Sequence, residues 1–142
     1  MSLAKLKNND QVHAYAVYRA AAEAMAQTGV TVEVKSEPGR YRLKVASRLV
    51  QVISRRSGDW QIKDAYKPLA PDTDVVIFVD LEGEEPTYYP VPGDWFRHDL
   101  AKRYAAYMAK VGERRQNPDT HHYAVKDSYV VRWESRWDVL TG

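Results

Sequence analysis

The chain begins with a helical pattern. Residues 11–27 are rich in alanine and contain no Gly or Pro before Gly29, which is typical of a helix that ends at a left-handed glycine. Asp10 is the expected N-cap. Two sets of residues recur at three- and four-residue steps: an apolar stripe of Ala14, Val17, Tyr18, Ala21 and Met25, and a small-residue row of Ala16, Ala20 and Ala24. The small-residue row predicts close packing on a flat surface.

Alternating apolar and polar residues follow this helix and predict strands. The alternation covers residues 31–35 and 41–46, residues 49–53 form an apolar-rich run, and residues 60–62 follow a turn at 57–59. An antiparallel meander is their simplest arrangement. Residues 75–81 form a nearly continuous β-branched and aromatic run, which is typical of a central strand buried on both faces. Residues 88–91 predict one more strand.

The C-terminal part predicts two helices. Residues 95–111 carry an apolar stripe that stops at Gly112, residues 116–120 are a polar loop, and residues 122–125 are a short extended piece. Val130, Trp133, Trp137 and Leu140 then predict a short terminal helix that buries both tryptophans. The expected fold is α/β in the broad sense that includes α+β. It has a flexible N-terminus at 1–9 and a single domain at 10–142, with a central mixed sheet of about five strands flanked by helices.

Length and composition exclude several classes of protein. A chain of 142 residues can bury a core as one domain without a disulfide or a structural metal. The absence of cysteine excludes iron–sulfur clusters, cysteine zinc sites and thiol nucleophiles. No apolar run approaches the roughly 20 residues of a membrane-spanning helix, and the start lacks the apolar region of a signal peptide. We therefore expect a cytoplasmic protein with no membrane partner.

The net charge of +2 conceals a separation of sign along the chain. Residues 40–56 contain six Lys or Arg and no Asp or Glu, and we call these six the basic strip: Arg40, Arg42, Lys44, Arg48, Arg55 and Arg56. Residues 72–87 contain six Asp or Glu and no Lys or Arg, and residues 97–115 contain six basic against two acidic residues. The basic strip predicts contact with a polyanion such as nucleic acid, with aromatic side chains such as Trp60 available for stacking.

Three pairs of segments in the sequence are distinctive. They are LVQVISRR with GDWQI at residues 49–62, VIFVDL with EPTYYPVP at 76–92, and DTHH with RWDVL at 119–140. Together with the order of elements, they resemble a bacterial group within the restriction-endonuclease-like, or PD-(D/E)XK, nuclease superfamily. The resemblance implies that superfamily's fold for roughly residues 10–140.

The resemblance also implies a place for the chemistry. In the superfamily, acidic groups on two neighbouring strands hold Mg²⁺, and a lysine two positions beyond the second acid faces the same spot. Here Gln51 falls on the ligand position, Ile53 stands where the lysine belongs, and Arg42 falls where an Asp belongs. The catalytic residues are thus unknown, and the resemblance implies a degenerate site without metal or cofactor. It favours a non-enzyme that binds DNA or RNA through the basic strip.

Two other functions stay open. A metal-dependent nuclease would need a relocated site with Mg²⁺ as its cofactor, for which Glu33 and Lys35 share one strand face and Glu23 offers a carboxylate on the first helix. A solvated strand face explains the same alternation. In the other alternative the chain is a protein-interaction module, a homodimer or the partner of another protein, without nucleic-acid binding.

Two further groups of side chains could ligate a metal. Asp119, His121 and His122 lie close in sequence, but adjacent histidines on an extended piece point to opposite faces, so a surface loop is the simpler interpretation. Asp80 and Glu82 follow the buried strand at 75–81, where an ordinary turn at the end of a strand explains both acids.

Overall fold

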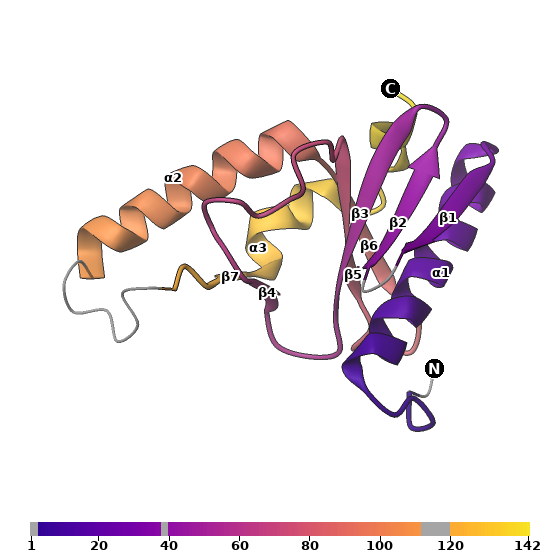
Figure 1. The fold of residues 1–142 in the computed structure, drawn as a ribbon, viewed down its shortest axis with the longest axis horizontal. Coiled ribbons are helices and arrows are strands. Elements are labelled where there is room, and N and C mark those ends of the chain that lie inside the picture. The colour runs from indigo at the N-terminus through magenta and orange to yellow at the C-terminus, as the bar shows by residue number, and fades with distance from the viewer. Residues whose placement is uncertain (1–2, 38–39, 112–119) are drawn as a thin grey trace.

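The computed structural model describes residues 3–37, 40–111 and 120–142, and its centre is a mixed sheet of five strands (Figure 1). The strand order is β1-β2-β3-β5-β6. Pairing is antiparallel throughout except for the parallel pair β3–β5. The bounds are β1 (Val32–Glu37), β2 (Arg40–Val45), β3 (Arg48–Arg55), β5 (Val75–Asp80) and β6 (Thr87–Pro92). The expected α+β class with a mixed five-stranded sheet is confirmed.

Helix α1 (Asn9–Thr28) covers one face of this sheet. The Asn8 side chain caps it by accepting from the Gln11 N–H at 2.9 Å, so the prediction of Asp10 as N-cap is wrong. Asp10 lies in the first turn, where its charge still favours the helix N-terminus. Gly29, at φ 73°, is the left-handed C-cap as predicted.

The face that α1 buries is the small-residue row. Ala16, Ala20 and Ala24 are fully buried. Of the expected apolar stripe, Val17 and Ala21 are buried beside them, whereas Tyr18 and Met25 are 55% and 40% exposed. Because alanine side chains are small, the helix backbone approaches the sheet closely. This close packing leaves no room for larger side chains on that face.

The opposite face of the sheet is covered by helix α2 (Gly93–Val111) and by a separate two-stranded sheet. That small sheet pairs β4 (Trp60–Ile62) with β7 (Tyr123–Val125), antiparallel. The prediction that residues 60–62 continue the meander is therefore wrong. β5 already occupies one edge of β3, and Trp60 and Ile62 are buried in the second core instead.

The C-terminal segment is divided into short turns where one helix was expected. It consists of α3 (Asp127–Val130), η2 (Val131–Trp133) and η3 (Trp137–Leu140), interrupted at Ser135, which has φ 55°. Both tryptophans are buried as predicted, but Trp133 packs in the core beneath α2 and Trp137 in the core beneath α1. One straight helix cannot supply both faces of a sheet, so the chain turns around the edge strand β6.

Three other expectations concern membrane-spanning helices, the segment around residues 112–120 and the N-terminus. Among the helices of the described residues, none is long and apolar enough to cross a membrane. The stop at Gly112, Asp119 and most of the loop at 116–120 lie outside the described residues. The flexible N-terminus at 1–9 stays a prediction, although Leu3 and Leu6 pack against the core beneath α1.

Candidate functional site

The central feature of the candidate site is the divergence of β2 from β3. The two strands pair only from Leu43↔Val50 to Val45↔Arg48, whereas β2 stays paired with β1 as far as Arg40. From Gln51 to Arg55, β3 therefore keeps β5 as its neighbour and has no β2 partner. The gap between the splayed strands is the base of a cleft.

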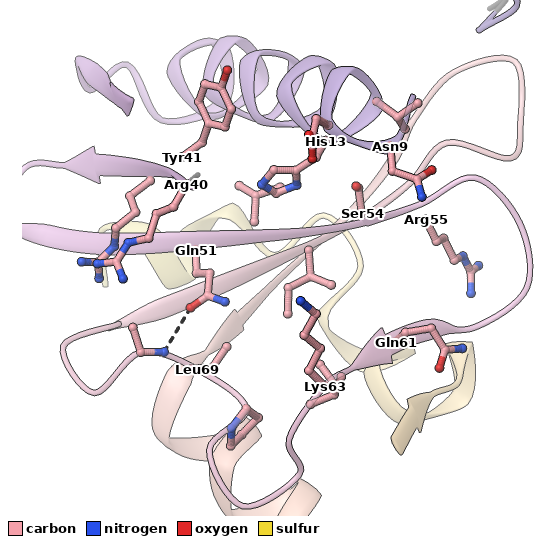
Figure 2. A pocket seen from close by; sticks show the side chains of 18 of the residues that line it. Asn9, His13, Arg40, Tyr41, Gln51, Ser54, Arg55, Gln61, Lys63 and Leu69 are labelled. Atoms are coloured by element: carbon pink, nitrogen blue, oxygen red, sulfur yellow. Dashed lines mark hydrogen bonds between the residues drawn. The ribbon is translucent and has the colours of Figure 1, made fainter. Parts of the chain in front are cut away.

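This cleft has a volume of about 1080 Å³. The first turns of α1 form one wall and residues 63–71 form the other, with the diverging ends of β2 and β3 between them (Figure 2). Its size is at the upper end of the range for ligand sites in proteins.

The cleft brings together the three positions that the resemblance singled out, Arg42, Gln51 and Ile53. Arg42 is 8% exposed, and its guanidinium donates two hydrogen bonds to the carboxylate of Asp72, of 2.7 and 3.1 Å. These bonds hold the pKa of Asp72 below its ordinary value, although burial opposes the shift. A fixed guanidinium at this position repels a divalent cation.

Gln51 is also engaged. Its side-chain oxygen accepts from the Ala70 N–H at 3.2 Å and from the Thr73 hydroxyl at 3.3 Å, the first drawn as a dashed line in Figure 2. The loop that supplies these donors is held from α2 as well, since Arg97 donates to the carbonyls of Ala70 and Thr73. With Gln51 occupied and Ile53 apolar, these two positions offer no free metal ligand.

Arg55 is buried in an ionic network. Its guanidinium bonds to Asp80 at 2.7 Å and to Asp127, and lies 3.8 Å from the centre of the Trp60 ring. Burial lowers the pKa of Arg55, but the bonds to the two carboxylates raise it by more than burial lowers it. The pKa of Arg55 therefore lies above its ordinary value. For Asp80 the directions are reversed: burial raises its pKa, but the bonds from Arg55 and the Glu82 N–H outweigh burial and bring the pKa below its ordinary value.

These contacts give Arg55 a structural position. It joins β3 to β5 through Asp80 and to α3 through Asp127. The same contacts account for the acid pair that follows the buried strand, because the Asp80 side chain also accepts from the backbone of Glu82 at 2.9 Å.

The basic strip therefore does not form one surface. Arg48 donates to the carbonyls of Val139 and Gly142, and Lys44 lies opposite Glu33 on β1; neither lines the cleft. Arg40 and Arg56 are exposed and line it. Neither of these two forms an ion pair among the described residues, although Arg56 donates to the Leu3 carbonyl at 3.4 Å and the charge of Arg40 helps to lower the pKa of Asp72.

Two lysines outside the basic strip complete the charged lining. Lys63 and Lys67 are exposed, line the cleft and form no ion pair within the described part of the chain. Figure 2 shows Lys63 pointing into the cleft. Sequence analysis missed both, because their position follows from the pairing of β4 with β7, which no local pattern indicates.

We call Arg40, Arg56, Lys63 and Lys67 the cleft cations. Two carboxylates, Asp10 and Asp59, also line the cleft. His13 adds no charge at neutral pH, because burial keeps its pKa below the ordinary value of 6.5 despite the nearby Asp10. Four cations that form no ion pair among the described residues, against two carboxylates, give the cleft a positive balance.

The residues of the relocated metal site are not brought together. Glu33 and Lys35 alternate with Val32 and Val34, which pack toward α1, so the two polar side chains face the other side of the sheet. Glu23 lies on α1 itself, in a second hollow of about 370 Å³. Within the described ranges, no group of three or more His, Asp or Glu side chains could hold a metal ion.

The histidines before β7 are separated in the same way. His121 Nδ1 lies 2.9 Å from the Tyr104 hydroxyl, and His122 is exposed.

Comparison of the chain with family models, with curated proteins and with solved structures found no match. The proposed function therefore rests on the geometry and charge of the cleft.

Proposed function

We propose that this chain binds nucleic acid through its phosphates in the cleft between β2 and β3, and that it does so without cleaving the strand. The observation that carries the proposal is the set of exposed cleft cations, which form no ion pair with any described residue, around a cavity of about 1080 Å³. Lys and Arg side chains that neutralise phosphates supply most of the affinity in non-specific nucleic-acid binding. Arg42 and Arg55 are not part of this contact, because both are committed to carboxylates.

The position of the cleft supports a restriction-endonuclease-like fold as part of the same proposal. The three positions that the resemblance assigned to the metal site line one cleft at the divergence of β2 and β3. One feature differs from the α-β-β-β-α-β order of that superfamily. The crossover from β3 to the parallel strand β5 contains β4 and no helix.

The proposal predicts that two cleft cations can be neutralised with a large loss of affinity. Binding of a fluorescein-labelled 20-nucleotide DNA or RNA is measured by fluorescence anisotropy, for the wild type and for the double variant Arg40→Ala, Lys63→Ala. Hydrogen bonds to charged groups contribute about 1.5–3 kcal/mol each, so we expect at least about a tenfold rise in Kd.

A matched control is Lys102→Ala, because Lys102 is an exposed lysine on α2 that does not line the cleft. We expect its Kd to stay within about twofold of the wild type, since surface charges away from a contact act weakly. Wild-type protein that binds neither DNA nor RNA, or equal losses in the control and the double variant, would contradict the proposal.

A second expected result concerns cleavage. Supercoiled plasmid incubated with the protein and Mg²⁺ or Mn²⁺ should remain intact, because Arg42 and Gln51 occupy the ligand positions with other contacts. Nicking that requires the metal and disappears in Glu33→Ala would restore the relocated-site alternative instead. Agarose gel electrophoresis distinguishes the two outcomes.

A further inference from the structure

An exposed tyrosine stands on the segment that forms one wall of the cleft. Tyr66 is 63% exposed. In the sequence it lies between Lys63 and Lys67, two of the cleft cations, but its own side chain does not line the cleft. An aromatic ring and two cations within five consecutive residues provide both contacts that a nucleic-acid strand uses, stacking for a base and charge for its phosphates.

The backbone around Tyr66 is fixed by hydrogen bonds. The Asp64 side chain accepts from the Tyr66 N–H at 2.9 Å, and the Lys67 N–H donates to the Asp64 carbonyl at 3.1 Å. The Ala65 N–H donates to the His121 carbonyl at 2.8 Å. The turn at 64–67 is therefore tied to the segment that leads into β7.

The ring of Tyr66 is held as well. Its centre lies 4.4 Å from the His121 ring and 5.3 Å from the Tyr104 ring, both in edge-to-face geometry. Tyr104 is buried and bonded to His121. An exposed aromatic ring that is already immobilised loses little conformational entropy when a ligand stacks on it.

We infer that the ligand of this cleft is single-stranded nucleic acid, with its phosphates at Lys63 and Lys67 and an unpaired base stacked on Tyr66 just outside the cleft. The inference rests on the proposed function and adds the class of substrate. In a duplex both faces of every internal base are covered by its neighbours, so away from the duplex ends only an unpaired base can present a face to Tyr66.

The test compares three probes of equal length, a poly-dT 12-mer, a poly-rU 12-mer and a blunt DNA duplex, by fluorescence anisotropy. The proteins are the wild type, Tyr66→Ala, Tyr66→Phe and a matched control, Tyr18→Ala, at another exposed tyrosine. Stacking contributes about 1–3 kcal/mol per base. We therefore expect Tyr66→Ala to weaken single-strand binding by at least about fivefold, while Tyr66→Phe and Tyr18→Ala stay within about twofold.

The wild type should bind both single strands at least about tenfold more tightly than the duplex, and the ratio of the dT to the rU affinity tells DNA from RNA. Equal affinity for duplex and single strands, or an unchanged Kd in Tyr66→Ala, would overturn the inference. If the double variant Arg40→Ala, Lys63→Ala still loses affinity in that case, the proposed function stands. If no probe binds the wild type, both fail. Circular dichroism of Tyr66→Ala shows whether its fold is retained, and Tyr66→Phe tests the ring independently of that variant.

Discussion

Arg55→Ala is expected to lower the free energy of unfolding by about 3–5 kcal/mol, because it leaves the carboxylate of Asp80 without its buried partner. Arg55 is 7% exposed, and its guanidinium is shared between Asp80 and Asp127. It also covers the face of Trp60 at 3.8 Å, a contact that is strengthened when water is excluded. Chemical denaturation followed by tryptophan fluorescence measures the change.

The control for this prediction is Arg136→Ala. Arg136 pairs with Asp138 on the exposed surface, where ion pairs contribute little, so its denaturation midpoint should stay close to that of the wild type. An Arg55→Ala protein that is as stable as the control but binds nucleic acid less tightly would contradict our assignment. Arg55 would then belong with the phosphate contacts, as the basic strip first predicted.

Trp60→Ala is expected to destabilise the protein by about 3–5 kcal/mol, the usual cost of removing a fully buried aromatic side chain. Trp60 is 0% exposed and contacts the rings of Phe78 and Tyr89 edge-to-face. Its indole N–H donates to the Val79 carbonyl at 3.1 Å. Since β4 continues directly into Lys63, this anchor also positions one wall of the cleft.

Trp60→Phe is the graded comparison. Phenylalanine keeps much of the ring packing but leaves the Val79 carbonyl without the indole donor, so we expect a smaller loss of stability than in Trp60→Ala. Both are measured by chemical denaturation. Equal stability of Trp60→Ala and the wild type would show that β4 is not held to the sheet in the way described.

Local pattern predicted most of the sheet and both long helices, because burial on one face imposes a period of 2 or 3.6 on the sequence. The placement of β4 could not be predicted in this way. Three residues with buried Trp60 and Ile62 fit a meander and a separate sheet equally well, and only the pairing with residues 123–125, about sixty positions later, decides between them.

The charge pattern was predictive only in part. The basic block at 40–56 and the acidic block at 72–87 meet in the fold, where Arg42 pairs with Asp72 and Arg55 with Asp80. The members of these two ion pairs are 30 and 25 residues apart in the sequence, so no local pattern reveals the pairing. Both arginines were therefore predicted to contact nucleic acid. Arg40 and Arg56 stay in the proposed contact, and Lys63 and Lys67 join them there because they line the same cleft.

The most direct test of the cleft as a phosphate-binding site is the salt dependence of nucleic-acid affinity. Each phosphate neutralised on a single strand contributes about −0.7 to the slope of log K against log salt concentration. Contact with all four cleft cations predicts a slope of about −3 for the wild type and about −1.5 for Arg40→Ala, Lys63→Ala. A wild-type slope near zero, or the same slope in the wild type and the double variant, would contradict the account.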